Sequence, residues 1–287
     1  MRPVYSLIVL FLLGGAVAAA EQLEQVQHLQ DSTVAIWKNS RIVGTAFVVD
    51  VGEGYVVALT AAHVVDHIEI AAPPSKDKKV KDAPKSIWTA VPVSGVTKLD
   101  RRGFARVIVY DEEEDLALLL ILTPDKFPHG LKLAEAKKPK LGEEVWHCGN
   151  PKGLMWGSVS KGIVSFAVRG SRTANGVQTF TQFTSTTMSG CSGGPVVRLG
   201  DKEPEVIGIM TRFLRTPCVD DKGKQMTVFS NTENMGLAVP MTRIATWAKK
   251  HKIGWLVGDG KPPKVEELNK MQPREGAAFL PMVMMTK

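Results

Sequence analysis

The sequence has only three cysteines among its 287 residues and only one long uncharged segment, residues 4–20. Three cysteines are too few to cross-link a chain of this length by disulfide bonds, so a disulfide scaffold is excluded. A single uncharged segment excludes a multi-span membrane protein. With 44% hydrophobic residues the chain is too apolar to be disordered. Its length fits one large globular domain or two small ones.

Basic residues outnumber acidic ones, 36 against 29, which gives a net charge of +7. Much of the excess lies in residues 75–102, which hold eight basic and three acidic side chains. A basic segment of this kind is usually solvated surface. We therefore expect no nucleic-acid partner.

The first 20 residues are predicted to be a secretory signal peptide. Arg2 precedes the apolar run Leu7–Leu13, and Ala18 and Ala20 form an Ala-x-Ala ending before Glu21. The apolar run is short for a hydrocarbon core about 30 Å thick, which favours cleavage over the alternative, an uncleaved N-terminal membrane anchor. We expect a secreted or periplasmic protein with no stable membrane span after cleavage.

From residue 30 to 250 the chain consists mainly of short segments rich in Val, Ile and aromatic residues, separated by Gly, Asn, Ser or charged clusters. Many closely spaced strands without intervening helices are typical of antiparallel barrels or sandwiches. The predicted strands form two sets. The first is Thr33–Trp37, Ile42–Asp50, Tyr55–Leu59, Phe104–Tyr110 and Leu116–Leu122, and the second is Glu143–His147, Val159–Val168, Gln178–Ser185, Pro195–Arg198, Val206–Thr211 and Leu237–Val239.

The segments between and after these sets complete the predicted organisation. Residues 126–142, rich in Pro and Lys, are the expected linker between an N-terminal unit, 21–125, and a C-terminal unit, 143–255. Ile244 and Trp247 stand at helical spacing, which predicts one terminal helix over Met241–Lys250. Residues 256–287 contain several prolines and no periodicity, and we expect a flexible tail.

The strongest local signal for chemistry is the segment Ser189–Pro195, with the sequence SGCSGGP. Its Ser192 is expected on a tight turn between two β segments, where glycine neighbours leave the hydroxyl uncrowded. Glycines also let backbone N–H groups point at one spot, as an oxyanion requires. Taken alone, the segment fits an ordinary Gly/Ser turn equally well.

Two other segments supply the groups that would activate this hydroxyl. His63 follows a predicted strand, and Asp115 opens an apolar run. A serine hydroxyl becomes a good nucleophile when a neutral imidazole takes its proton and a carboxylate orients that imidazole. Asp111–Glu114 compete with Asp115 for the acid's role, but we expect them in an exposed turn. The sequence thus predicts His63 as the base, Asp115 as the acid and Ser192 as the nucleophile.

The segments that carry these residues resemble the three signature segments of the chymotrypsin-fold serine peptidases. Other segments are similar to the HtrA/Deg branch of that family, and all of them occur in the right order between about residues 33 and 250. The signature segments are Thr60–His63, Asp115–Leu118 and Gly190–Pro195, and the HtrA/Deg-like ones are Gly149–Gly153, Gly162–Ser165, Gly208–Thr211 and Gly236–Pro240.

The resemblance implies an all-β fold of two antiparallel six-stranded-type β-barrels with the active site in the cleft between them. His63 and Asp115 would come from the first barrel and Ser192 from the second. It implies a secreted serine endopeptidase that cleaves polypeptides through an acyl-enzyme. The N–H groups of Gly190 and Ser192 would form the oxyanion hole, and no cofactor is required.

Alternatives stay open beside this hypothesis. A catalytically silent trypsin-like binding module and a viral or phage maturation peptidase would share the fold. His67 follows His63 at a spacing that suits a metal on a helix, but no third ligand is evident, so we expect no metal. About 35 residues follow Lys252, too few for the PDZ domain of HtrA/Deg proteins.

The cysteines mark a departure from the family. Cys191 stands where digestive relatives carry the Asp that receives a new N-terminus, so activation by that ion pair is not expected. The resemblance places Cys191 within reach of Cys148. Three free thiols are the default expectation, and a Cys148–Cys191 bridge is the alternative.

The resemblance also indicates the substrate pocket, which two stretches would line. Thr186, Thr187 and Met188 precede the nucleophile, and Thr211 and Arg212 lie on the strand after it. The first stretch contains no acid, which disfavours cleavage after Lys or Arg. A pocket for small, branched or uncharged side chains is favoured. If Arg212 faces the cleft, it could hold a substrate carboxylate, and cleavage after Glu is the second choice.

Overall fold

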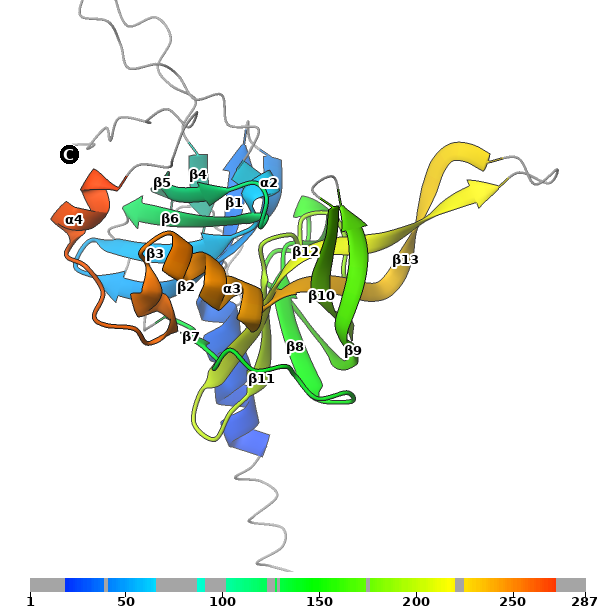
Figure 1. Cartoon of the computed structure of the whole chain (residues 1–287), viewed down its shortest axis with the longest axis horizontal. Coiled ribbons are helices and arrows are strands. Elements are labelled where there is room, and N and C mark those ends of the chain that lie inside the picture. Colours follow the sequence, from blue (N-terminus) through cyan, green and yellow to red (C-terminus); the bar gives the residue numbers. More distant parts are fainter. Residues whose placement is uncertain are drawn as a thin grey trace, which may run out of the picture.

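The computed structural model describes residues 19–38, 41–65, 87–90, 102–122, 127, 130–173, 176–219 and 225–271. In these ranges every predicted strand of both sets is present, and the strands form two separate sheets (Figure 1). His67 lies outside the described residues, as does the predicted signal peptide up to residue 18.

The first sheet is a closed barrel in the order β1-β2-β3-β6-β5-β4. All its paired strands are antiparallel. The strands are β1 (Thr33–Lys38), β2 (Arg41–Gly52), β3 (Tyr55–Thr60), β4 (Ile87–Ala90), β5 (Arg102–Asp111) and β6 (Leu116–Leu122). The short β4 was not predicted. It lies within the basic segment 75–102, of which the structure describes only these four residues and Arg102.

The pairing of β3 with β6 shows why β6 is one continuous apolar run. Leu59 is paired with Leu118, and both belong to one hydrophobic cluster. The next pair, Ala58 and Leu119, belongs to the other cluster. Alternate residues of a strand point to opposite faces, so a strand with two buried faces is apolar at every position.

The second sheet has seven strands in the order β11-β8-β9-β10-β13-β12-β7, and β11 also pairs with β12. The strands are β7 (Lys132–Leu133), β8 (Glu144–Gly149), β9 (Ser158–Thr173), β10 (Gly176–Thr184), β11 (Pro195–Leu199), β12 (Pro204–Val219) and β13 (Gln225–Pro240). The strands β12 and β13 continue beyond the sheet as a long two-stranded arm (Figure 1).

The predicted terminal helix is confirmed as α3 (Met241–Lys250), which crosses the junction between the two sheets (Figure 1). Its buried residues recur at helical spacing, as expected for one packed face. The remaining helical segments are residues 19–31, α2 (Ala62–Val65), the 3-10 turns η1 (Pro151–Gly153) and η2 (Gly254–Val257), and α4 (Val265–Lys270). No helix in the described ranges is long and apolar enough to cross a membrane.

Two segments are more ordered than the sequence analysis expected. The expected linker contains β7, which pairs in parallel with β12, and Leu131, just before this strand, is buried in the core. The expected flexible tail contains α4, whose Leu268 is fully buried and accepts a hydrogen bond from Arg106 at its backbone carbonyl. Isolated apolar residues among Pro and Lys give no periodicity, so neither contact is visible in the sequence.

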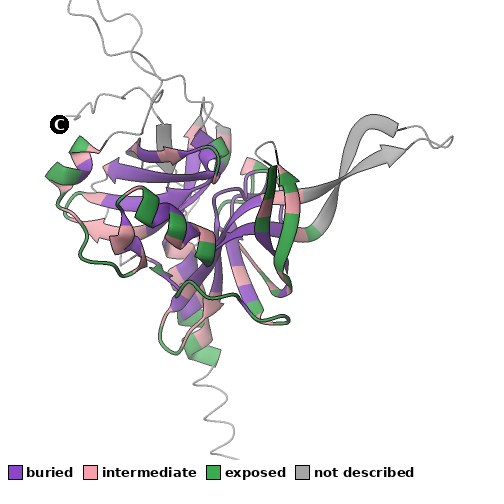
Figure 2. Ribbon diagram, viewed as in Figure 1, coloured by how far each residue is buried: buried purple, intermediate pink, exposed green. Residues whose placement is uncertain are grey.

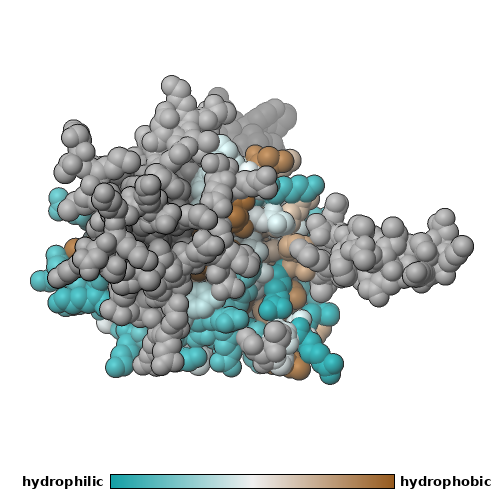
Figure 3. Space-filling view, turned by 90° about the horizontal axis from the view of Figure 1, so that it is seen from above, coloured by the Kyte–Doolittle hydropathy of each residue, from teal (hydrophilic) through white to brown (hydrophobic). Residues whose placement is uncertain are grey.

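Buried residues run through the middle of both sheets, and exposed ones lie on α3, α4, the loops and parts of β9 and β10 (Figure 2). On the face shown in Figure 3, hydrophobic residues lie in small groups among hydrophilic ones. The large hydrophobic side chains that are exposed in the described ranges include Leu154, Met155 and Trp156 after η1, and Ile163, Phe166, Val168 and Val177 on β9 and β10.

Candidate active site

His63 and Asp115, which are 52 residues apart in the chain, are in direct contact. The ring Nδ1 of His63 lies 2.9 Å and 3.0 Å from the two carboxylate oxygens of Asp115. The backbone N–H of His63 also donates to Asp115 Oδ1 at 3.0 Å. An ionised carboxylate only accepts hydrogen bonds, so Nδ1 carries the ring proton. Nε2 is then left with its lone pair, which is the state that a general base needs.

The turn that carries Asp115 joins β5 to β6. Asp115 has a φ of 55°, a left-handed conformation that Asp tolerates better than most residues. Its carboxylate is buried, whereas the His63 side chain is 44% exposed. The acid is thus shielded from water, while the imidazole remains accessible.

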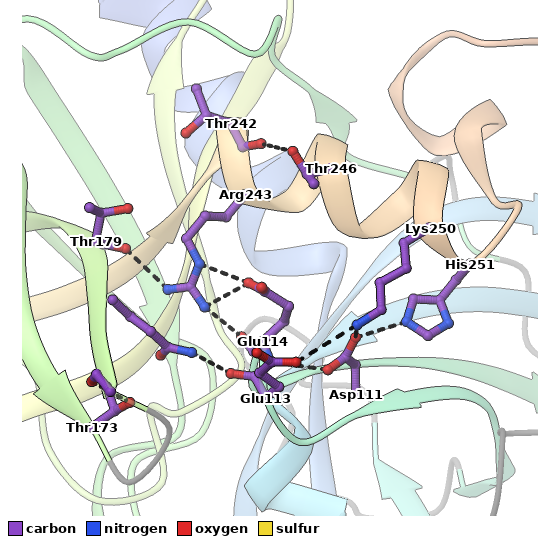
Figure 4. Close-up of polar contacts among 12 residues, drawn as sticks. Asp111, Glu113, Glu114, Thr173, Thr179, Thr242, Arg243, Thr246, Lys250 and His251 are labelled. Atoms are coloured by element: carbon purple, nitrogen blue, oxygen red, sulfur yellow. Dashed lines mark hydrogen bonds and ion pairs between the residues drawn. The ribbon is translucent and has the colours of Figure 1, made fainter.

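Helix α3 holds this turn in place (Figure 4). Arg243 pairs with the Glu114 carboxylate at 2.7 Å and donates to the carbonyl of Thr179 on β10 at 3.1 Å. At the other end of the turn, Asp111 accepts from Lys250 at 2.9 Å and contacts the His251 ring at 2.8 Å. The turn is therefore fixed to α3 at both ends and to the second sheet through Arg243.

This arrangement corrects the expectation that Asp111–Glu114 form an exposed turn. Asp111 is buried, Glu114 is partly buried, and only Glu112 and Glu113 are exposed. The partners of Asp111 lie about 140 residues away in the chain, so the run of four acids could not reveal them. Burial acts to raise the pKa of Asp111, but hydrogen bonds from His251 and Lys250 outweigh it and hold the pKa below its usual range.

Ser192 lies on the predicted tight turn at the start of β11. The turn meets the first barrel, because the backbone N–H of Thr45 on β2 donates to Ser192 O at 2.8 Å. At Gly193, with a φ of 84°, a Cβ would stand 2.2 Å from Thr60 Oγ1 and 3.0 Å from Ala61 N. Only glycine allows the turn to lie this close to the segment that carries His63.

No hydrogen bond joins Ser192 Oγ to the His63 ring in the described part of the chain. Contacts between nucleophile and base are often loose in a peptidase without substrate. The structure therefore brings His63 and Asp115 into contact and places Ser192 on the adjoining turn.

The peptide groups of the nucleophile turn leave two N–H groups without an acceptor in the described structure. The N–H of Cys191 donates to Met188 O, that of Gly193 to Met210 O and that of Gly194 to Cys191 O. Among the described residues, the N–H groups of Gly190 and Ser192 have no acceptor. These are the two groups that the sequence analysis expected to form the oxyanion hole.

The direction of the Gly190 N–H follows from its own peptide group. Ser189 O, in the same peptide plane, accepts from Lys152 N at 2.6 Å. In a trans peptide the C=O and N–H point in opposite directions. The N–H of Gly190 therefore points away from the loop that carries Lys152.

Cys148 and Cys191 are free, buried thiols, and no disulfide joins them. Burial raises the pKa of Cys148 to about 12 and that of Cys191 to about 11. Thiols with such pKa values are protonated at neutral pH, which disfavours either cysteine as a nucleophile. The side chain of Cys218, on β12, lies outside the described residues.

The residues predicted to line the substrate pocket differ in exposure. Thr186 is exposed and Met188 is partly buried. Thr187 and Thr211 are buried, and their hydroxyls have no hydrogen-bond partner within the described ranges. The Arg212 guanidinium lies over the ring of Phe180, 5.7 Å from its centroid, and its buried Nε has no hydrogen-bond partner in the part of the chain that the structure describes.

Sequence reasoning missed several residues that support this site, namely Thr45, Lys152, Arg243, Lys250 and His251. Thr45 stands in a strand of small and apolar residues, where a buried hydroxyl gives no distinctive pattern. Asn150 belongs to a segment that resembles HtrA/Deg proteins, but the segment alone did not assign it a contact.

The fold agrees with the comparison to known proteins. The family model described as "Trypsin-like peptidase domain" matches residues 44–209, and the chain belongs to that family. This confirms the resemblance to trypsin-like serine peptidases, and the relatives to which the chain is similar are of the HtrA/Deg type.

The relatives include the periplasmic serine endoprotease DegP of Salmonella typhimurium. It is 30% identical over 172 residues, which cover 60% of this chain and 30% of DegP. The chain thus spans less than a third of the length of such relatives.

Two solved structures share the fold. An inactive form of Rv3671c from M. tuberculosis H37Rv has a TM-score of 0.52 at 19% identity, covering 83% of this chain and 92% of that one. The HtrA-type protease AlgW with a tripeptide has a TM-score of 0.50 at 22% identity, covering 80% and 62%.

Proposed function

We propose that this protein is a serine endopeptidase that hydrolyses polypeptides through His63, Asp115 and Ser192. The contact of His63 Nδ1 with the buried Asp115 carboxylate carries the proposal. It leaves Nε2 unprotonated on the side of the ring that can take a proton from a hydroxyl. The family membership of residues 44–209 supports the same activity.

The proposed reaction runs in two halves. His63 Nε2 takes the proton of Ser192 Oγ, which attacks the substrate carbonyl carbon. The resulting oxyanion accepts hydrogen bonds from the N–H groups of Gly190 and Ser192. His63 then gives the proton to the leaving amine, and an acyl-enzyme remains. In the second half His63 takes a proton from water, which attacks the acyl carbon. The bond from the acyl carbon to Ser192 Oγ then breaks, His63 returns the proton to Oγ, and the acid is released.

Asp115 holds the imidazole in one tautomer and stabilises its charged form during both halves. No step needs a cofactor or a metal ion.

We further propose that the second sheet serves as the second barrel and that the site lies in the cleft between the two. The pairing of β11 with β12 supports this, since it links the first strand of the sheet order to the last but one. The periplasmic relatives and the predicted signal peptide support an exported location.

For specificity we propose cleavage after small, branched or uncharged residues. The partnerless hydroxyls of Thr187 and Thr211 support a modest, polar pocket. The partnerless Nε of Arg212 supports the second choice, cleavage after Glu. Peptide-library cleavage read by mass spectrometry, with Arg212→Ala beside the wild type, separates the two. A selective loss of cleavage after Glu or Asp favours the second choice, and efficient cleavage after Lys or Arg contradicts both.

The catalytic proposal is tested with a fluorophosphonate probe and casein hydrolysis. We expect labelling of the wild type, and a fall in turnover of about 10⁴- to 10⁶-fold for Ser192→Ala and His63→Ala. Folded wild-type protein that neither reacts with the probe nor cleaves casein would instead favour the silent binding module.

The acid is tested with Asp115→Asn. Asp115 Oδ1 already accepts the backbone N–H of His63, so the amide oxygen takes that place and the NH₂ group faces Nδ1. His63 is then held with its proton on Nε2, and we expect a loss of about 10⁴-fold. Glu112→Gln, an exposed change in the same turn, is the matched control and should retain full activity. Equal losses in the two variants would refute the assignment of Asp115.

A further inference from the structure

An oxyanion hole works only if the Gly190 N–H is held towards the substrate. Gly190 has a φ of 94°, and a glycine offers little resistance to rotation of the peptide groups on either side of it. Rotation of the Ser189–Gly190 peptide would replace the N–H donor by a carbonyl oxygen, which repels an oxyanion. Contacts outside the turn must therefore hold both neighbouring carbonyls.

Thr45 of the first barrel holds the carbonyl on one side. This residue is fully buried, and its hydroxyl lies 2.7 Å from Gly190 O, 2.9 Å from Asn150 Nδ2 and 3.2 Å from Asn150 N. A hydroxyl has one proton and two lone pairs. Because both nitrogens donate to the oxygen, its only proton is directed to Gly190 O.

Asn150 sets the direction of this bond and also shapes the loop that holds the other carbonyl. Its Oδ1 accepts from Gly157 N at 3.0 Å, which identifies the remaining amide atom as the nitrogen donor to Thr45. Its backbone oxygen accepts from Gly153 N at 2.9 Å. The loop closed in this way presents the N–H of Lys152 to Ser189 O.

The fit between the loop and the turn is close. A Cβ on Gly190 would stand 2.2 Å from Asn150 O and 3.1 Å from Gly153 N. Lys152 itself has a φ of 55°, a left-handed conformation that is unfavourable for a lysine unless its surroundings impose it.

We infer that Thr45 and Asn150 are positioning residues of the oxyanion hole. Together they fix the carbonyls on both sides of Gly190, one through the Thr45 hydroxyl and the other through Lys152. The inference rests on the proposed function, because the hole has a use only in a peptidase. Neither residue is assigned a contact with substrate, so each acts on the rate through the orientation of the Gly190 peptide.

Four variants of the full chain test this inference. Thr45→Val keeps the shape and removes the hydroxyl, and Thr45→Ser restores it. Asn150→Asp replaces the NH₂ donor by an acceptor and draws the Thr45 proton away from Gly190. Thr181→Val is the matched control, since Thr181 is also buried and donates to a backbone carbonyl, that of Ala167, at 3.1 Å.

We expect Thr45→Val and Asn150→Asp to lower kcat by about 10- to 100-fold, somewhat less than removal of a whole oxyanion donor, with KM unchanged. Thr45→Ser should recover most of the loss. Thr181→Val should lower the melting temperature as Thr45→Val does but keep the wild-type kcat.

A folded Thr45→Val variant with wild-type kcat would overturn the inference, and so would an equal loss of kcat in Thr181→Val. Crystal structures of the wild type and Thr45→Val give a readout that does not need turnover. We expect the Gly190 N–H to turn from its wild-type direction in the variant, and an unchanged turn would overturn the inference. A wild type that is inactive towards substrate and probe would refute the proposed function, whereas the pair of crystal structures would still decide this inference.

Discussion

His147, on β8, should make the stability of the protein fall as the pH is lowered from 7 to 4. The residue is 1% exposed, and its Nδ1 lies 3.0 Å from the carbonyl oxygen of Pro195. A carbonyl only accepts, so Nδ1 carries the proton and Nε2 must be the unprotonated nitrogen. Nε2 is buried with no partner in the described structure. A second proton would therefore place a charge and an unsatisfied donor inside the sheet.

The size of the effect follows from the pKa. Burial lowers the pKa of His147 to about 4, against 6.5 for the exposed side chain. The folded pKa lies below the unfolded one, so between these values the unfolded chain binds more protons and stability falls with falling pH. A difference of this size amounts to about 3 kcal/mol of the free energy of unfolding. That is a large part of the 5 to 15 kcal/mol, roughly, of a typical domain.

The assay is urea unfolding between pH 7 and pH 4 for the wild type and for His147→Asn. The Asn side chain keeps a donor near Pro195 and does not titrate. Other groups titrate in both proteins, so they cancel in the difference. We expect the stability advantage of the wild type over His147→Asn to shrink by about 3 kcal/mol across this range. A difference that stays constant with pH would refute the argument that Nε2 cannot be charged in the folded state.

Three further predictions concern the surroundings of the site. Asp111→Asn should be less stable than the wild type at pH 7. The gap in melting temperature should begin to close near pH 4, where the unfolded carboxyl takes up protons, and should vanish as the pH falls through the lowered pKa of folded Asp111. A gap that does not change with pH would mean that the negative charge of Asp111 does not contribute to stability. Arg243→Met should lower kcat by roughly tenfold with little change in KM, because the turn that carries Asp115 loses one of its two links to α3, the one at Glu114, and Arg243→Lys should recover part of the loss. An unchanged kcat would show that the turn carrying Asp115 keeps its conformation without Arg243. In the native protein, Cys148 and Cys191 should resist a thiol-disulfide reagent, whereas the denatured chain should show three thiols. A denatured chain with one thiol would demonstrate a bridge.

The sequence predicted the strands well, because β propensity and apolar runs are local properties. It predicted α3 for the same reason, from the spacing of Ile244 and Trp247. It did not predict β4, since a four-residue strand within a basic segment has no pattern of its own. Nor did it predict α4, whose single fully buried residue, Leu268, is too little for a periodicity.

The candidate site was accessible to sequence reasoning only in part. His63, Asp115 and Ser192 stand in short segments of distinctive composition, so the three could be proposed before their geometry was known. The residues that hold them are ordinary in sequence. Thr45 and Arg243 have roles that depend on partners more than 100 residues away, and such partners are set by tertiary packing alone.

The position of α3 bears on when the protein would become active during its synthesis. Ribosomes deliver a chain from its N-terminus, and folded units form in that order. The first barrel, with its base and acid, would be complete before the nucleophile turn is made. The groups that secure the acid's turn, at Arg243 and Lys250, emerge later still. A nascent chain would therefore reach full peptidase activity only after nearly all of its folded part has been synthesised. Its own unfolded segments would then not be cleaved during synthesis.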